Sequence, residues 1–211
     1  MPQPRPPVSR PAAPPATPWH WGHLWLAPHR LAFFTGVLLL MASGLWWAAV
    51  QLDRLSGALG LSYAVSPTLT HAAVMVLGFM PLFVAGFLFT AGPKWLGVAG
   101  PEARDITPAL ALQALGWLLW LAGAHTHVAL AAAGAFTASL GLALQFGRFW
   151  QLWWRSPATD RVHATVVAVG GTLGVLCAAG LGVALLLGAG PVALALVHTA
   201  LWGFVVATYV A

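Results

Sequence analysis

The chain has 211 residues, of which 60% are hydrophobic and only 6% are charged. Because soluble domains carry about 25% charged residues, this composition excludes a water-soluble domain and predicts an integral membrane protein. The net charge of +5 does not indicate a nucleic-acid partner, since the basic residues stand singly between apolar blocks. The single cysteine, Cys177, excludes an intramolecular disulfide.

The composition changes twice along the chain. Residues 1–18 are rich in proline and alanine, and we expect a disordered or polyproline-like cytoplasmic tail there. Residues 19–30 hold three tryptophans and three histidines, whose amphipathic rings suit the headgroup layer of a membrane. Residues 31–211 predict an all-α transmembrane bundle with the lipid bilayer as its partner. Its six helices are expected at about 31–52, 69–91, 107–124, 127–147, 163–188 and 191–211.

Polar or glycine-rich breakers separate most of these runs, and the four acidic residues are expected in the resulting loops. The segment 148–161 is one such charged breaker. The weakest division lies at residues 124–127, where a tight helical hairpin is favoured and one long kinked helix is the alternative. The last run reaches Ala211 without a polar flank, so we expect a longer protein of which this chain is about half.

Glycines and basic residues add detail to this bundle. Glycines inside the apolar runs predict close helix contacts and offer faces for an oligomer; they include Gly36, Gly44, Gly170, Gly174 and Gly182. The positive-inside rule predicts a cytoplasmic N-terminus, because only one of the nine lysines and arginines, Arg54, then falls on the outer side. The other eight basic residues fall on the cytoplasmic side: Arg5, Arg10, Arg30, Lys94, Arg104, Arg148, Arg155 and Arg161.

The histidines are the candidate site residues, since no acidic residue is expected within a span. The topology puts His71, His125, His127 and His198 in one layer near the outer face, where four imidazoles could hold haem iron, copper or zinc. The competing interpretation makes His125 and His127 interfacial hydrogen-bonding residues at helix ends. His198 lies deeper in its apolar run, where an imidazole is costly to bury without a partner.

A family resemblance begins at Thr70-His71-Ala72-Ala73-Val74-Met75 and continues through Ala85-Gly86-Phe87-Leu88-Phe89-Thr90-Ala91 to Pro93-Lys94-Trp95. This stretch resembles the signature helix of the NnrS family, with its WHAHEM, AGFLLTA and PNW elements. Residues 28–34 are similar to the family's PFRPFF entry into its first helix. The resemblance implies a polytopic bacterial inner-membrane protein that contains haem and copper and is linked to nitric oxide metabolism and nitrosative stress.

Two ligand-type residues of the family motif are missing here, because Ala73 and Val74 stand where the family has its second histidine and its glutamate. Only His71 carries over from that motif, with His198 as the second candidate for the cofactor. The expected function is therefore an accessory, haem- or copper-associated role in the response to nitric oxide, more in keeping with a non-enzyme. The alternatives are a metal-free transporter or channel-like protein and a quinol-linked membrane cytochrome.

Overall fold

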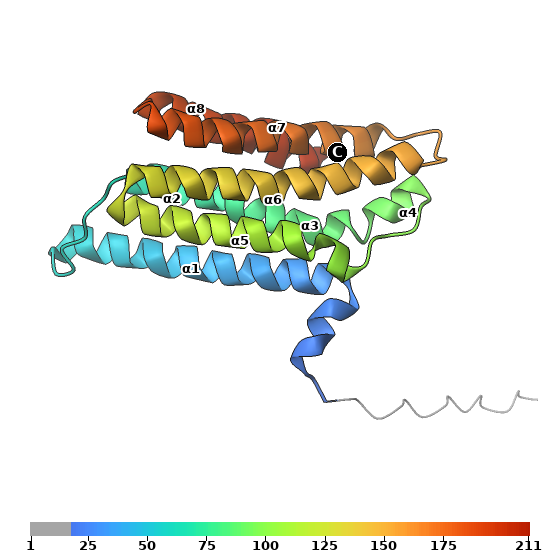
Figure 1. Ribbon diagram of the computed structural model, residues 1–211, viewed down its shortest axis with the longest axis horizontal. Helices are drawn as coiled ribbons and strands as arrows, with labels where there is room; N and C mark the ends of the chain where they lie inside the picture. Colours follow the sequence, from blue (N-terminus) through green and yellow to red (C-terminus); the bar gives the residue numbers. More distant parts are fainter. Residues whose placement is uncertain (1–17) are drawn as a thin grey trace, which may run out of the picture.

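The computed structural model describes residues 18–211, so the tail predicted at residues 1–18 lies outside the described residues except for Pro18. In the described part all regular elements are helical, and six helices are long and apolar enough to cross a membrane. The predicted all-α bundle of six spans is confirmed, and Figure 1 shows the helices lying side by side along one direction. A short helix, η1 (Trp21–Leu26), precedes the bundle.

Of the six spans in the described residues, four are single helices and two are built from several pieces. The first span is α1 (Pro28–Ser56), and the third to fifth are α5 (Ala103–Thr126), α6 (Val128–Arg155) and α7 (Val162–Leu186). The second span comprises α2 (Pro67–Ala73), the π-helix η2 (Val74–Phe79) and α3 (Met80–Leu88), followed by the short α4 (Gly92–Leu96). The sixth comprises α8 (Gly190–Ala200), the π-helix η3 (Leu201–Val206) and α9 (Ala207–Val210).

Local sequence explains where the helices start and stop. Proline occupies the first turn of α1, α2 and α8, where its missing N–H costs no helical hydrogen bond. Gly57 follows α1 in the left-handed region at φ 64°, and its N–H bonds the carbonyl of Asp53. Glu102 and Asp105 form a capping box at the start of α5.

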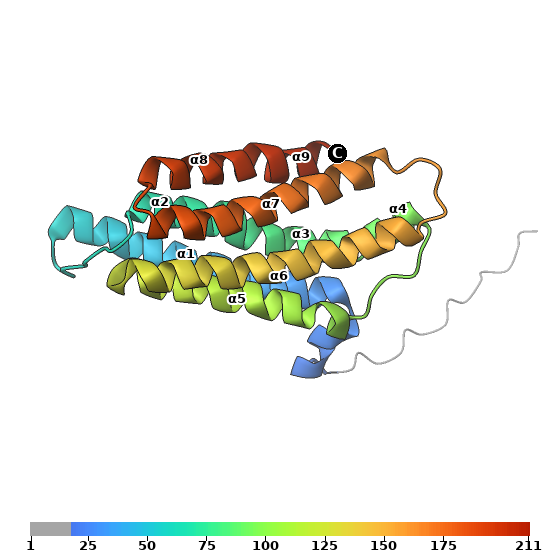
Figure 2. The same cartoon turned by 45° about the horizontal axis from the view of Figure 1, so that its top comes forward.

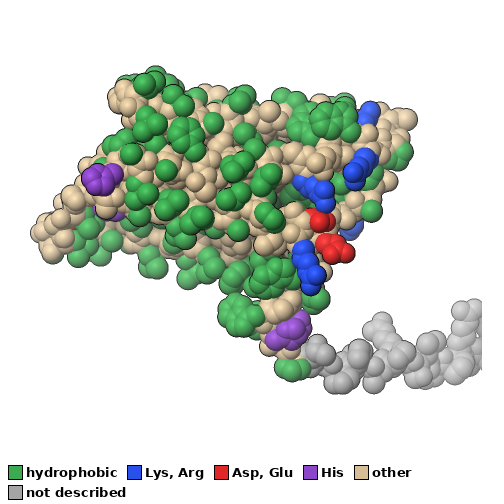
Figure 3. All heavy atoms as spheres, viewed as in Figure 1, with side chains coloured by type: hydrophobic (Ala, Val, Ile, Leu, Met, Phe, Trp, Pro, Cys, Tyr) green, Lys and Arg blue, Asp and Glu red, His purple; other side chains and the backbone are tan. Residues whose placement is uncertain are grey.

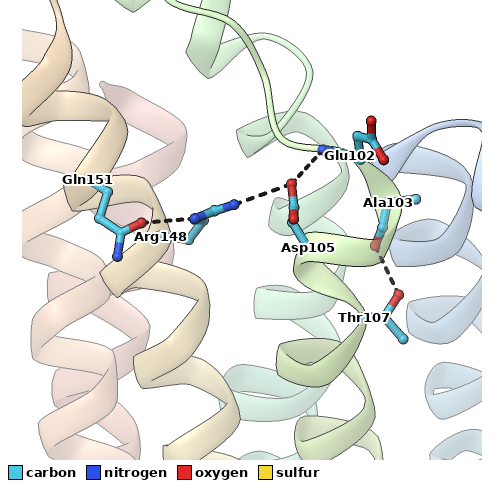
Figure 4. Close-up of polar contacts among 6 residues, drawn as sticks. All are labelled: Glu102, Ala103, Asp105, Thr107, Arg148 and Gln151. Atoms are coloured by element: carbon cyan, nitrogen blue, oxygen red, sulfur yellow. Dashed lines mark hydrogen bonds and ion pairs between the residues drawn. The ribbon is translucent and has the colours of Figure 1, made fainter.

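Three helices are longer than the apolar runs predict, and this corrects the expected loops. Asp53 lies in the last turn of α1, Asp105 lies in the first turn of α5, and α6 continues through Arg148 to Arg155. About 20 residues cross the hydrocarbon, so helices of this length extend beyond it into a polar layer. Figure 4 shows the result at one such end, where Arg148 bonds Gln151 and forms a 3.2 Å ion pair with Asp105.

The helical hairpin of α5 and α6 is confirmed, with His127 in extended conformation between the two helices. The two backbones touch along a seam formed by Gly116 and Gly123 of α5 and Gly134 and Gly141 of α6. A Cβ atom at Gly141, for example, would lie 2.7 Å from the carbonyl oxygen of Ala109. These four glycines were not among those singled out in the sequence, although they allow the closest helix contact in the bundle.

The glycines that were singled out have mixed outcomes. A Cβ at Gly170 would lie 3.0 Å from the carbonyl oxygen of Gly203, and one at Gly174 would lie 2.6 Å from the ring of Phe204. Both close contacts seat η3 against α7, as the spacing predicts. At Gly44 the expectation of a close contact is wrong, because a Cβ there would meet nothing within 4 Å.

The second and sixth spans are parallel neighbours in the bundle. Both start at the end of the bundle that holds the α5–α6 turn, and α8 contacts α2 and η2 while η2 contacts η3 (Figures 1 and 2).

Two buried glutamines, Gln113 of α5 and Gln145 of α6, join their helices, with 2.8 Å between the Gln113 amide nitrogen and the Gln145 amide oxygen. The nitrogen of Gln145 in turn donates to the carbonyl of Pro81, so α5, α6 and α3 share one polar contact.

Candidate functional site

The two ends of the bundle differ in their ionisable residues. In Figure 3 the visible lysine and arginine side chains gather at one end, which we call the basic end. Histidine is visible both beside this end and at the opposite end, which we call the histidine end after its four candidate ligands. The histidine end holds the α1–α2, α5–α6 and α7–α8 connections. All four candidate ligands, His71, His125, His127 and His198, lie on the elements of this end.

His125, in the last turn of α5, uses both of its ring nitrogens. The indole N–H of Trp46 donates to Nε2 at 2.6 Å, and Nδ1 lies 2.8 Å from the carbonyl oxygen of Ser62. Because Nε2 accepts a hydrogen bond, the ring proton must be on Nδ1, which then donates to Ser62. His125 therefore joins α1, the α1–α2 loop and α5 through hydrogen bonds that fill both ligand positions of a neutral imidazole.

His71, in α2, has different surroundings. Its ring stacks on the indole of Trp47, with 4.5 Å between the ring centroids and 14° between the planes. Its Nδ1 atom is buried and has no hydrogen-bond partner among the described residues. Stacking thus fixes the plane of the ring while leaving this nitrogen without a partner, which is costly unless something binds there.

Other buried polar atoms on the helices around α2 also lack partners within residues 18–211. The hydroxyls of Ser43 and Thr70 are fully buried, as are the indole N–H groups of Trp117 and Trp120. They lie on α1, α2 and α5, which contact one another, and the Trp117 ring packs against Gly78 of η2. Buried polar groups are normally hydrogen-bonded, so each of these unpartnered atoms is a place where water or a ligand could bind.

The remaining two candidates have exposed side chains. His127 is the single residue between α5 and α6, and its backbone bonds Gly123 on one side and Leu130 and Ala131 on the other. His198 lies on α8 with its side chain on the surface of the described bundle. Like His71, it comes three residues before a π-helix, and the two π-helices are in contact. Single π-turns are rare and are frequent at functional sites.

The four imidazoles do not form a closed metal site by themselves. Within residues 18–211, no group of three or more His, Cys, Asp or Glu side chains lies close enough to hold a metal ion. Haem, in contrast, can be held through a single histidine, and His71 has a ring nitrogen without a hydrogen-bond partner. Within the described residues the histidine end therefore offers one buried, unpartnered imidazole nitrogen, at His71, and no cluster of three or more such side chains.

The histidines of the basic end have local roles. His20 and His23 lie with 3.8 Å between their ring centroids, and the carbonyl of His23 accepts a hydrogen bond from Arg30. Desolvation, followed by the charges of His20 and Arg30, holds the pKa of His23 below its ordinary value. His29 lies near Phe33 in the first turns of α1, and His163 is exposed at the start of α7.

The sequence interpretation missed the aromatic partners of the histidines and the π-helices. Trp46 and Trp47 are adjacent in α1, and each pairs with a different histidine of the histidine end. The Trp-Trp pair about two turns before the end of an apolar run was the available signal. No local pattern in residues 74–79 or 201–206 indicates a π-turn.

Comparisons with known proteins assign the whole bundle to one family. Neither the curated proteins nor the solved structures gave a match to this chain. A family model described as "NnrS protein" matches residues 23–211, which include all six spans and all four histidines of the histidine end. This match extends the resemblance of the first hundred residues through the last helix, and the chain belongs to the NnrS family.

Proposed function

We propose that this protein carries haem near the histidine end of its bundle and has an accessory role in the bacterial response to nitric oxide. Membership of the NnrS family supports the accessory role in the nitric oxide response, which the resemblance to the family implies. The observation that carries the proposal is the Nδ1 atom of His71, which is buried without a hydrogen-bond partner while its ring is held by Trp47. Haem bound through this histidine would supply the capacity to bind a diatomic ligand.

The protein's own contribution is to place and protect the imidazole. A ligand histidine usually donates its second ring N–H to a neighbour, which fixes the orientation of the ring. In the described residues the stacked indole of Trp47 takes over this orienting role. The buried hydroxyls of Ser43 and Thr70 lie on the two helices that carry Trp47 and His71, where they can bond a polar group brought in by the ligand.

His198 is the candidate for a second contact with the same cofactor. It lies on the parallel neighbour of the span that carries His71, at the same position relative to a π-helix. An exposed imidazole within an apolar helix is costly in lipid, so a partner for it is expected. Copper bound here would need ligands in addition to the described side chains.

The test is cofactor analysis of the full chain, purified in detergent from a haem-sufficient host. We expect a haem Soret band that shifts when nitric oxide is added without oxygen. The His71→Ala protein should lose most of its haem, whereas His29→Ala should keep it, because His29 lies at the opposite end of α1 from Trp47.

Size-exclusion chromatography separates loss of a ligand from loss of the fold, since a folded His71→Ala protein elutes as the parent does. Parent protein without haem, or a His71→Ala protein with full haem content, would refute the proposal. Reduction of bound haem by quinol would instead favour the quinol-linked cytochrome.

The proposed orientation places the basic end in the cytoplasm of the bacterial inner membrane. Of the lysines and arginines in the described residues, only Arg54 lies at the histidine end. The others lie at the basic end: Arg30, Lys94, Arg104, Arg148, Arg155 and Arg161. An alkaline phosphatase fusion should be active after residue 57 and inactive after residue 100. The reverse pattern would contradict this orientation.

A further inference from the structure

Three cavities meet at the basic end, around the start of α7. The central one, which we call the head cavity, has a volume of about 400 Å³ and is lined by Asp160, Arg161 and His163 together with Trp95 and Thr208. Its charged and polar lining comes from the α6–α7 loop and the first turn of α7. The head cavity therefore combines three ionisable side chains with a wall that is otherwise largely apolar, next to the first turn of α7.

Two apolar cavities adjoin the head cavity on different sides of α7. One, of about 280 Å³, is lined by Phe87, Leu88 and Tyr209 and shares Trp95, Val167 and Thr208 with the head cavity. The other, of about 550 Å³, is lined by Val166, Val169, Gly170, Gly203 and Ala207 and shares Arg161 and Val162 with the head cavity. One cavity that carries charged side chains is thus flanked by two cavities with almost wholly apolar walls.

We propose that these three cavities hold a two-chain phospholipid with a zwitterionic, amine-bearing headgroup. Two apolar cavities beside one cavity with charged side chains match two acyl chains joined at one head, whereas a single-tailed lipid would fill only one of the apolar cavities. The head is assigned by charge. Arg161 and His163 face the phosphate, and the carboxylate of Asp160 faces the ammonium group.

Arg161 is held in place for this contact. Its guanidinium lies over the ring of Trp153 at 4.3 Å, and one of its terminal nitrogens donates to the Trp153 carbonyl at 3.1 Å. In the described part of the chain the guanidinium makes no ion pair, since Arg148 with Asp105 is the pair found there. Most of its N–H groups can therefore bond a phosphate.

Asp160 and Thr208 complete the match to a phospholipid. One carboxylate oxygen of Asp160 accepts the N–H of Val162 at 3.0 Å, which orients the side chain at the mouth of the head cavity. The Thr208 hydroxyl is buried without a partner among residues 18–211, and it lies on the wall shared by the head cavity and the smaller apolar cavity. In the proposed complex the ester carbonyl of an acyl chain would lie at this junction, and rotation of the Thr208 side chain would let its hydroxyl donate to that carbonyl.

The test compares lipids bound to the full chain by native mass spectrometry after exchange into nanodiscs. Nanodiscs contain equal amounts of phosphatidylethanolamine, phosphatidylcholine and phosphatidylglycerol with matched chains. We expect retention of phosphatidylethanolamine over both others, since phosphatidylcholine has no ammonium N–H and phosphatidylglycerol has no cation for Asp160. Asp160→Asn should reduce the preference over phosphatidylcholine by about tenfold.

Three controls make the outcome specific. Glu102 lies at the same end but lines none of these cavities, so Glu102→Gln, which also removes a negative charge, should leave the headgroup preference unchanged. Ala207→Leu should obstruct the larger apolar cavity and favour single-chain lysophosphatidylethanolamine over the two-chain lipid. Thr208→Val should weaken retention of all two-chain lipids by a few fold without changing the headgroup preference.

Each outcome decides the proposal. Equal retention of the three lipids, or an unchanged preference in folded Asp160→Asn protein, would overturn the headgroup assignment. Co-purification of a quinone with no bound phospholipid would overturn the lipid class. An Ala207→Leu protein that still prefers the two-chain lipid would overturn the assignment of the second acyl chain.

Discussion

His71 and His125 lie at the same end of the bundle on neighbouring helices, and their imidazoles have opposite surroundings. His125 has a hydrogen-bond partner at each ring nitrogen, from Trp46 and Ser62, and holds three segments together. His71 stacks on Trp47 and has a buried nitrogen with no partner in the described residues. Two histidines at similar depth can thus be structural in one case and available for a ligand in the other.

The strongest test of this contrast is to replace each imidazole with a phenyl ring of similar shape. His125→Phe should lower the free energy of unfolding by about 1–3 kcal/mol, because the Trp46 N–H and the Ser62 carbonyl both lose their partner. Reversible unfolding in mixed detergent micelles measures this change. A His125→Phe protein as stable as the parent would show that these two hydrogen bonds do not hold the histidine end.

A smaller effect is expected from Trp46→Phe, which removes only the donor to Nε2 of His125. We expect a loss of about 1 kcal/mol in the free energy of unfolding, measured in the same way. In the Trp46→Phe, His125→Phe double variant the two losses should not add, since both remove one shared hydrogen bond. Full additivity would mean that the two rings act independently.

His71→Phe should change the free energy of unfolding of cofactor-free protein by no more than about 0.5 kcal/mol. The phenyl ring keeps the stacking on Trp47, and no hydrogen bond of the described structure is lost at Nδ1. The same variant should nevertheless lose bound haem, which the Soret absorbance measures. A loss of stability as large as that of His125→Phe would place His71 among the structural histidines.

The smallest effect is expected at His198, whose side chain is exposed on α8. His198→Leu should leave the stability of the cofactor-free bundle within about 0.5 kcal/mol of the parent, since no described hydrogen bond is broken. Thermal unfolding in detergent is sufficient to detect a larger change. A marked loss would indicate that this imidazole has a structural partner within the bundle.

The six spans could be predicted from the sequence because hydrophobic length is a local property. About 20 apolar residues are needed to cross the hydrocarbon, and no water is available there for unpaired backbone groups, so each run must be a helix. The hairpin at residues 124–127 and the gathering of four histidines at one end follow from the same count. The family resemblance at residues 70–95 was likewise carried by local motifs, and the match over residues 23–211 confirms it.

The helix ends were less predictable, since polar residues there can extend a helix instead of ending it. Arg148 lies within α6, where it pairs with Asp105 in the first turn of α5, although the sequence placed both in loops. Capping groups and the opposite charge on the neighbouring helix stabilise these turns outside the hydrocarbon. Their contribution depends on a partner far away in the sequence.

What the sequence by itself determined is the number of spans and the order of residues along each, because the position within an apolar run sets the approximate height along the membrane normal. Only the tertiary structure decided which residues meet at a given depth, since that depends on the direction each helix face takes when the helices pack. The glycine seam between α5 and α6, the parallel contact of η2 with η3 and the choice of Trp46 for His125 and Trp47 for His71 all arise in this way. Adjacent residues on a helix point about 100° apart, so the same sequence signal at Trp46 and Trp47 reaches two different histidines.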